Sequence, residues 1–321
     1  MPGSQEQKSS KAVSRGGFGI AAAMVAMLVL PAALTLHSVR IAPVVDPNAA
    51  NPSPYGYTVS LLLFLVPIAG IGFWLVPQEG VRISKKAFWS TIALLFPLGA
   101  ALDFFFAYRF FVFPRPSATL GVKAPALGGG VPVEEYAFYL LGFIVVLLMY
   151  IWLDEGWLSA YTVPGESAER VRFERLLRFH PFSAVFAVGL IAAAIVYKRF
   201  FSAEPEGFPG YFTFLVLIAL TPAVALFPEA RRMINWRAFS LTFFVILLTS
   251  LLWEATLAVP YGWWGYQGRE MMGLRVTAWS GLPIEAVVLW LAVTFATVVV
   301  YEVVKRWKGS GKTARAAFLG R

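Results

Sequence analysis

Long apolar runs alternate with short polar segments along this chain, and the alternation predicts its elements. An apolar run of about 20 residues is long enough for a helix to cross a bilayer. Eight such runs are present, at residues 18–38, 57–76, 87–108, 132–153, 181–198, 210–228, 238–258 and 282–304. The pattern therefore predicts an all-α integral membrane protein with about eight transmembrane helices.

The two halves of the sequence resemble each other at an offset of 151 residues, which places Pro77 on Pro228 and Asp103 on Glu254. At the same offset Pro132-Val133-Glu134 falls on Pro283-Ile284-Glu285. We expect two four-helix repeats, which are parallel because each has an even number of spans. The expected domains are a disordered cytoplasmic tail (1–17), a first repeat (18–155), a cytoplasmic connector (156–180), a second repeat (181–306) and a basic cytoplasmic tail (307–321).

The composition excludes several classes of protein. The 321 residues are 58% hydrophobic and 14% charged, unlike an ordinary soluble enzyme. The sequence has no Cys and two His, which excludes thiolate metal sites, a Cys nucleophile and a multi-histidine iron site. Glycine motifs that bind dinucleotides or phosphates are also missing. We therefore expect neither a metal nor another cofactor.

The basic residues predict the orientation in the membrane. With the N-terminus inside, the inner segments carry 19 Lys and Arg and the outer segments carry 8. Cytoplasmic loops are the ones enriched in Lys and Arg. Both termini are thus expected in the cytoplasm, with the chain in a bacterial-type cell membrane. This distribution accounts for the net charge of +9, and no nucleic-acid partner is expected.

Acidic residues recur inside the predicted helices, where a carboxylate costs at least ~2.5 kcal/mol. Asp103 and Glu254 lie near the outer ends of their helices, and Glu134 and Glu285 begin the next helix in each half. The first half adds Glu135, which points about 100° away from Glu134 on a helix and is expected to have a different role. A helix N-terminus stabilises an acid, which accounts for Glu134 and Glu285 but not for the other two positions.

These acids are expected to converge in one pocket open toward the outer leaflet. Close carboxyl groups in a poorly solvated site share protons unequally, so that one can donate a proton while another accepts one. Ion pairs with Arg109 or Arg275 are the structural alternative. Aromatic residues near the acids form either an interfacial belt or a wall that stabilises a carbocation; the candidates for binding substrate are Phe104, Tyr108, Tyr136, Trp253, Trp263, Trp264 and Tyr266. The glycines at 128–130 predict a flexible loop, with a lid hinge as the alternative.

The segment Pro132-Val133-Glu134-Glu135-Tyr136-Ala137-Phe138-Tyr139 resembles a motif of membrane-integral lycopene β-cyclases, the heterodimeric bacterial type that also occurs as fused tandem domains. Trp253-Glu254 and Pro283-Ile284-Glu285 resemble the same domain again, so the resemblance covers roughly 57–155 and 208–306. The second copy has Ala286 in place of the second Glu, and Leu102 precedes Asp103 where the family has Trp.

The resemblance implies a cofactor-independent, proton-initiated cyclisation of a polyprenyl or carotenoid chain. Lycopene is the expected substrate and a β-ring carotenoid the expected product. The implied catalytic residues are Asp103, Glu134, Glu135, Glu254 and Glu285, with the Glu pair of the first half supplying the proton. Expected partners are an isoprenoid substrate in the bilayer and other membrane enzymes of the carotenoid pathway.

Three other interpretations stay open at the level of sequence. Intramembrane acids and parallel repeats also suit a proton-coupled transporter or a lipid-binding membrane protein. A terpenoid cyclase with another substrate fits the same residues. The change to Ala286 is also compatible with an inactive scaffold that keeps the fold.

Overall fold

The computed structural model describes residues 53–162 and 180–319. Within these ranges the chain is mostly helical, and seven helices are long and apolar enough to cross a membrane: Gly56–Gln78, Lys85–Phe110, Val133–Trp157, Phe182–Phe200, Gly210–Ala230, Trp236–Ala258 and Ile284–Gly309. Each coincides with one of the predicted runs from 57–76 onward. The run predicted at 18–38 and the tail at 1–17 lie outside the described residues.

Several of these spans contain a π-helical turn. The first comprises α2 (Gly56–Ser60), α3 (Leu62–Ala69), a π-helical turn at Gly70–Leu75 and α4 (Val76–Gln78). The other elements are α5 (Lys85–Phe110), α6 (Val133–Trp152) with a π turn at Leu153–Trp157, α7 (Phe182–Phe200), α8 (Gly210–Leu215) and α9 (Thr221–Ala230) around a π turn at Val216–Leu220, α10 (Trp236–Trp253) with a π turn at Glu254–Ala258, α11 (Ile284–Gly309) and α12 (Ala314–Leu319).

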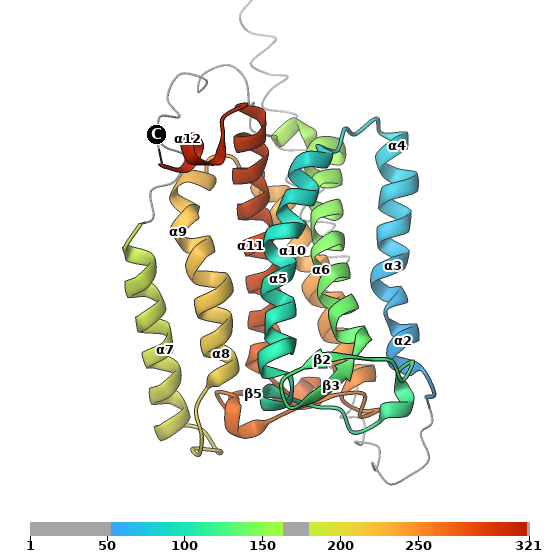
Figure 1. Ribbon diagram of the computed structural model, residues 1–321, viewed down its shortest axis with the longest axis vertical. Helices are drawn as coiled ribbons and strands as arrows, with labels where there is room; N and C mark the ends of the chain where they lie inside the picture. The colour runs from blue at the N-terminus through green and yellow to red at the C-terminus, as the bar shows by residue number, and fades with distance from the viewer. Residues whose placement is uncertain (1–52, 163–179, 320–321) are drawn as a thin grey trace, which may run out of the picture. The chain divides into compact units, whose positions relative to one another are not determined.

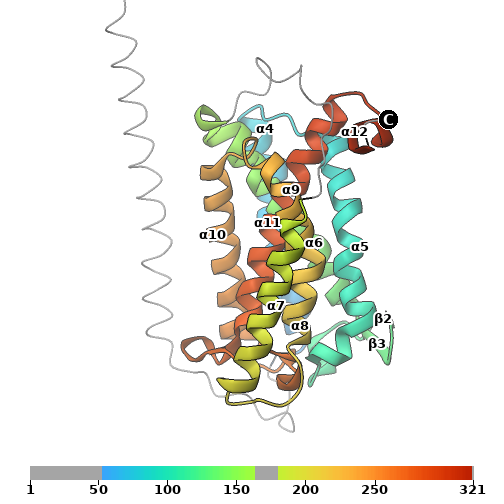
Figure 2. The same cartoon turned by 90° about the vertical axis from the view of Figure 1, so that its left-hand side faces the viewer.

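The two helices that carry the Pro-x-Glu motifs form the core. α11 packs against α5, α6, α9 and α10, and α6 packs against α3, α5, α10 and α11. In the α6 and α11 spans, 67% of the most apolar stretch of the helix is buried inside the protein, whereas the figure for α7 is 22%. Figure 1 accordingly shows α7 and α3 at opposite margins, and Figure 2 shows α10 and α5 on opposite sides of α11 and α6.

Short antiparallel strands lie at one end of the bundle, which we call the hairpin end (Figure 1). The pairs are β2 (Lys123–Ala126) with β3 (Gly129–Pro132), β5 (Arg275–Val276) with β6 (Leu282–Pro283), and β1 (Phe111–Val112) with β4 (Gly265–Tyr266). The first two pairs immediately precede α6 and α11. The third joins segments from the two halves of the chain.

Gly128 lies in the turn between β2 and β3, while Gly129 and Gly130 belong to β3, so two of the three glycines predicted to form a loop lie in a strand. Gly128 and Gly129 have φ of 93° and 143°, a region that side chains rarely adopt. A Cβ on Gly130 would lie 2.8 Å from Cβ of Lys123 on the paired strand. The three glycines therefore make a tight two-stranded turn possible.

Candidate active site

All five predicted acids are buried near the hairpin end of the bundle. Their exposed fractions are 0% for Asp103, 1% for Glu134, 7% for Glu135, 2% for Glu254 and 0% for Glu285. Asp103 lies on α5, the Glu pair in the first turn of α6, Glu254 at the start of the π turn after α10, and Glu285 in the first turn of α11. Burial of so many carboxyl groups is costly, so their immediate partners decide what each can do.

Glu134 anchors the loop before its own helix. Its Oε1 accepts hydrogen bonds from Oγ1 of Thr58 at 2.5 Å and from the backbone N–H of Leu120 at 2.7 Å. Glu285 makes the corresponding contact in the second half, where Oε1 accepts from the backbone N–H of Met272 at 2.5 Å. Each of these glutamates therefore fixes a loop of the hairpin end to a helix N-terminus.

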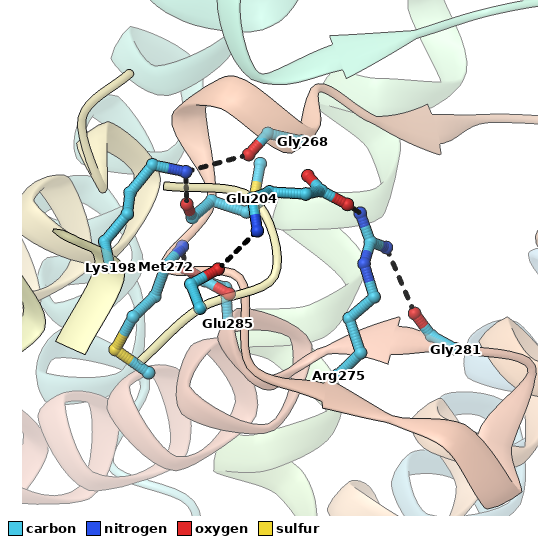
Figure 3. A network of polar contacts seen from close by, with 9 residues as sticks. Lys198, Glu204, Gly268, Met272, Arg275, Gly281 and Glu285 are labelled. Carbon is cyan, nitrogen blue, oxygen red and sulfur yellow. Dashed lines mark hydrogen bonds and ion pairs between the residues drawn. The ribbon is translucent and has the colours of Figure 1, made fainter. Parts of the chain in front are cut away.

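The surroundings of Glu285 are a network that ties loops together (Figure 3). Lys198 Nζ donates to the backbone oxygens of Gly268 at 3.2 Å and Met271 at 2.7 Å. Arg275 pairs with Glu204 at 3.0 Å and also donates to the Gly281 carbonyl at 3.3 Å. Glu285 thus lies near the basic side chains Lys198 and Arg275, whose contacts with backbone carbonyls organise the segment before α11.

Glu135 and Glu254 instead line a common cavity, which we call the acid chamber. Its volume is about 20 Å³, roughly enough for one water molecule. It brings together one carboxyl group from each half of the chain. The remaining lining residues are Tyr57, Phe111, Phe138, Tyr139, Tyr211, Trp253, Trp264, Tyr266 and Leu289.

The two chamber acids have different hydrogen-bond partners. Glu254 accepts a short hydrogen bond from the Tyr266 hydroxyl and another from Trp290 Nε1 at 3.3 Å. The Tyr57 hydroxyl lies within hydrogen-bonding reach of Glu135, whose Oε1 has no partner within the described ranges. Glu254 therefore has two hydrogen-bond donors, while Glu135 keeps one oxygen available to a reacting group.

Asp103 lies close enough to Glu135 for the two carboxyl groups to interact electrostatically. Both of its carboxyl oxygens are buried without a hydrogen-bond partner among residues 53–162 and 180–319. The proposed ion pairs with Arg109 and Arg275 do not form with these acids, because Arg109 contacts Glu270 at 3.2 Å and Arg275 contacts Glu204. Asp103 therefore supplies a third buried carboxyl group, next to Glu135 and outside the chamber lining.

Tyr266 is a chamber donor that lies between two membrane-spanning segments. Burial and the neighbouring Glu254 carboxylate raise the pKa of the Tyr266 phenol well above its usual value. The phenol consequently keeps its proton at neutral pH and remains a hydrogen-bond donor to Glu254.

The predicted aromatic residues divide into two groups. Trp253, Trp264 and Tyr266 line the chamber. The others lie elsewhere: Phe104 is 37% exposed, Tyr108 and Tyr136 donate to the carbonyls of Gly130 and Pro125 at the β2–β3 hairpin, and Trp263 donates to Ser53 Oγ at 2.9 Å.

The chamber wall also contains aromatic residues that the sequence did not single out. Phe138 and Tyr139 follow Glu135 by one helical turn, so helical spacing was a usable signal for them. Tyr57 and Tyr211 come from distant helices and become recognisable only in the folded chain. The ring centroids of Trp253 and Trp264 lie 4.8 Å apart and those of Phe138 and Trp253 5.4 Å apart. The cavity that contains the two acids is therefore lined by packed aromatic rings, and the face of such a ring attracts positive charge.

Comparison with protein-family models, with curated proteins and with solved structures finds no match to this chain. No cluster of three His, Asp or Glu side chains in the described part of the chain is arranged to hold a metal ion.

Proposed function

We propose that the protein is a cofactor-independent isoprenoid cyclase that adds a proton to a polyene and closes a ring. The observation that carries the proposal is the acid chamber, in which one carboxyl group from each half lines the same aromatic-walled cavity. Lycopene is the proposed substrate, and a β-ring carotenoid is the proposed product.

The proposed reaction begins with Glu135 as the acid. Its carboxyl proton adds to the terminal trisubstituted double bond of the substrate, and a tertiary carbocation forms. The internal double bond attacks this cation, which closes the ring and moves the positive charge onto the ring. The π faces of Trp253, Trp264 and Phe138 favour the cation over the neutral substrate.

Glu254 then acts as the base. It removes a proton from the carbon next to the ring cation, and the electrons of that C–H bond form the ring double bond. The product is an isomer of the substrate, and one proton passes from Glu135 to Glu254 in each turnover. Return of this proton across the chamber restores the starting state, and Asp103 beside Glu135 provides a further proton store.

The finer architecture also belongs to the proposal. α5 and α10 begin 151 residues apart, as do α6 and α11. We propose parallel four-helix repeats, with the hairpin end on the outer face of the membrane and both termini in the cytoplasm. The acid chamber then opens from the outer half of the bilayer.

The test is conversion of lycopene by the purified protein in lipid, read by pigment chromatography. Glu135→Gln keeps the size of the side chain but removes the transferable proton, and loss of a general acid costs about 10²–10⁴-fold in rate. Asp103→Asn should also reduce the rate, because Asp103 supports Glu135.

Glu134→Gln is the matched control at the adjacent position. It retains an acceptor oxygen for Thr58 and Leu120, so activity should stay within about threefold of wild type. Equal losses for Glu134→Gln and Glu135→Gln would contradict the assignment, and no conversion by the wild-type protein would contradict lycopene as the substrate.

A proton-coupled transporter is the second candidate, supported by a separate buried cluster at the opposite end of the same two helices. Glu302 on α11 is 2% exposed and accepts a hydrogen bond from the Tyr150 hydroxyl at 3.0 Å, while Lys305 pairs with Glu155 at 2.5 Å. Acid clusters at both ends of a bundle suit stepwise proton transfer. Acidification of proteoliposomes driven by an added solute would favour this function over cyclisation.

A further inference from the structure

A second cavity, larger and apolar, lies directly beside the acid chamber. Its volume is about 260 Å³, and α5, α6, α8, α9 and α11 contribute to its wall. Tyr139 is the single lining residue of this cavity with a polar side chain. We call this cavity the apolar groove.

The groove extends along most of the bundle and opens sideways. It follows α11 from Leu289 to Val304, a distance of about 22 Å at 1.5 Å per residue. Two of its lining residues on α5, Leu94 and Leu98, are 53% and 37% exposed on the flank of the bundle. In a bilayer this flank faces hydrocarbon, so the groove is accessible from lipid.

Tyr139 and Leu289 belong to both cavities. Their side chains are 5% and 6% exposed, so they form the wall between the apolar groove and the acid chamber. A chamber of about 20 Å³ is too small for an isoprene unit. A substrate end therefore enters only when this wall moves.

We propose that the apolar groove is the binding site for the extended chain of a linear isoprenoid, and that Tyr139 and Leu289 form the gate through which one end reaches the acids. This inference rests on the proposed function and adds the direction of entry, laterally from the bilayer. The chain lies lengthwise between α5, α9 and α11, and its reacting end turns inward at Tyr139.

The position of Tyr139 depends on a glycine across the groove. A Cβ on Gly99 of α5 would lie 2.9 Å from Cγ of the Tyr139 ring. Gly99→Ala therefore forces the ring to move. Gly142 on α6 is the matched control, because a Cβ there would lie at an ordinary 3.7 Å from the Trp290 ring.

Binding is measured first, in a Glu135→Gln background in which substrate is retained without turnover. The probe is lycopene added to the full-length protein in nanodiscs, followed by quenching of tryptophan fluorescence. Ala223→Phe fills the groove from α9 and should weaken binding at least about tenfold. Ala219→Phe, at a partly exposed position of the same wall, repeats the test if Ala223→Phe does not fold.

Ala193→Phe is the control for added bulk, since Ala193 is exposed on α7 and lies outside the groove. The affinity of this control for lycopene should match that of the Glu135→Gln protein without the added Phe. Unchanged binding in the folded groove variants would overturn the proposal. A phospholipid that copurifies in the groove and that lycopene does not displace would also overturn it, because the occupant would then be an acyl chain.

The gate is tested by turnover of the otherwise wild-type protein. Gly99→Ala should change kcat by about tenfold while lycopene affinity, measured with Glu135→Gln present, changes less than twofold. Gly142→Ala should leave both unchanged. Equal kcat values for all three proteins would overturn the gate. Groove-dependent binding without any turnover in wild type would instead retain the binding site and reject the proposed cyclisation.

Discussion

Neighbouring carboxyl groups in this protein differ more in their partners than in their burial. Glu134 and Glu135 are adjacent and both buried, yet Glu134 accepts hydrogen bonds from Thr58 and Leu120 while Glu135 lines the acid chamber. Helical periodicity predicts that they point in different directions. It does not predict which one meets the loop, because that depends on contacts with α2 and the segment before β2.

The Tyr266–Glu254 contact gives a prediction for a single hydroxyl group. Tyr266→Phe removes a donor to a buried carboxylate, and a hydrogen bond to a charged group contributes about 1.5–3 kcal/mol. We expect turnover of lycopene to fall about 10- to 100-fold. Tyr108→Phe is the control, because the Tyr108 hydroxyl donates to a carbonyl of the β2–β3 hairpin and lies outside the chamber.

The same substitution changes the alkaline pH dependence of stability. The Tyr266 pKa is raised in the folded state by burial and Glu254, so its contribution is complete below the usual phenol pKa of about 10 and is lost as pH rises toward the folded value. Thermal unfolding at increasing pH should therefore show a shallower alkaline decline in Tyr266→Phe. An identical alkaline decline in wild type and Tyr266→Phe would contradict the proposal that Tyr266 causes part of this decline.

At the scale of elements, helices could be predicted from sequence and strand pairs could not. The run at 87–108 corresponds to α5 because its apolar length alone requires a helix in a bilayer. The pairing of Phe111 with Tyr266 and Val112 with Gly265 joins segments too far apart in sequence for any local pattern. The sequence predicted only part of the acid-chamber wall for the same reason, because Tyr57 and Tyr211 reach the chamber from α2 and α8.

The starts of α5 and α10 differ in a way that can be measured. Asn235 caps α10, where its side chain accepts from the backbone N–H groups of Arg237 and Ala238 at 3.2 Å. Ser84 occupies the same position before α5 and makes no side-chain cap. Asn235→Ala should lower the free energy of unfolding by about 1–2 kcal/mol, while Ser84→Ala should change it by less than about 0.5 kcal/mol.

Unfolding of the two variants in mild detergent, followed by circular dichroism, makes this comparison. Asn235 also donates from Nδ2 to the Leu158 carbonyl at 3.2 Å, so its loss acts on two segments. Equal losses of stability in the two alanine variants would contradict the prediction that the Asn235 cap contributes more than Ser84.

The orientation of the whole molecule can be tested because the sequence has no Cys. Single Cys variants at Lys123 on β2 and at Lys312 before α12 place thiols at exposed positions near opposite ends of the bundle. We expect a membrane-impermeant maleimide to label Lys123→Cys in intact cells and Lys312→Cys only after permeabilisation. The reverse pattern would place the acid chamber in the inner half of the bilayer.

A groove about 22 Å long that leads to a chamber at one end has a consequence for the order of products. A symmetrical polyene held lengthwise presents one terminus to Glu135 while its other terminus lies outside the chamber. Closing a second ring then requires the molecule to leave, reverse and bind again. A time course should therefore show the one-ring carotenoid rising before the two-ring carotenoid, and excess lycopene should prolong this interval by competing for the vacated groove. Simultaneous appearance of both products would mean that the molecule reverses without leaving the protein.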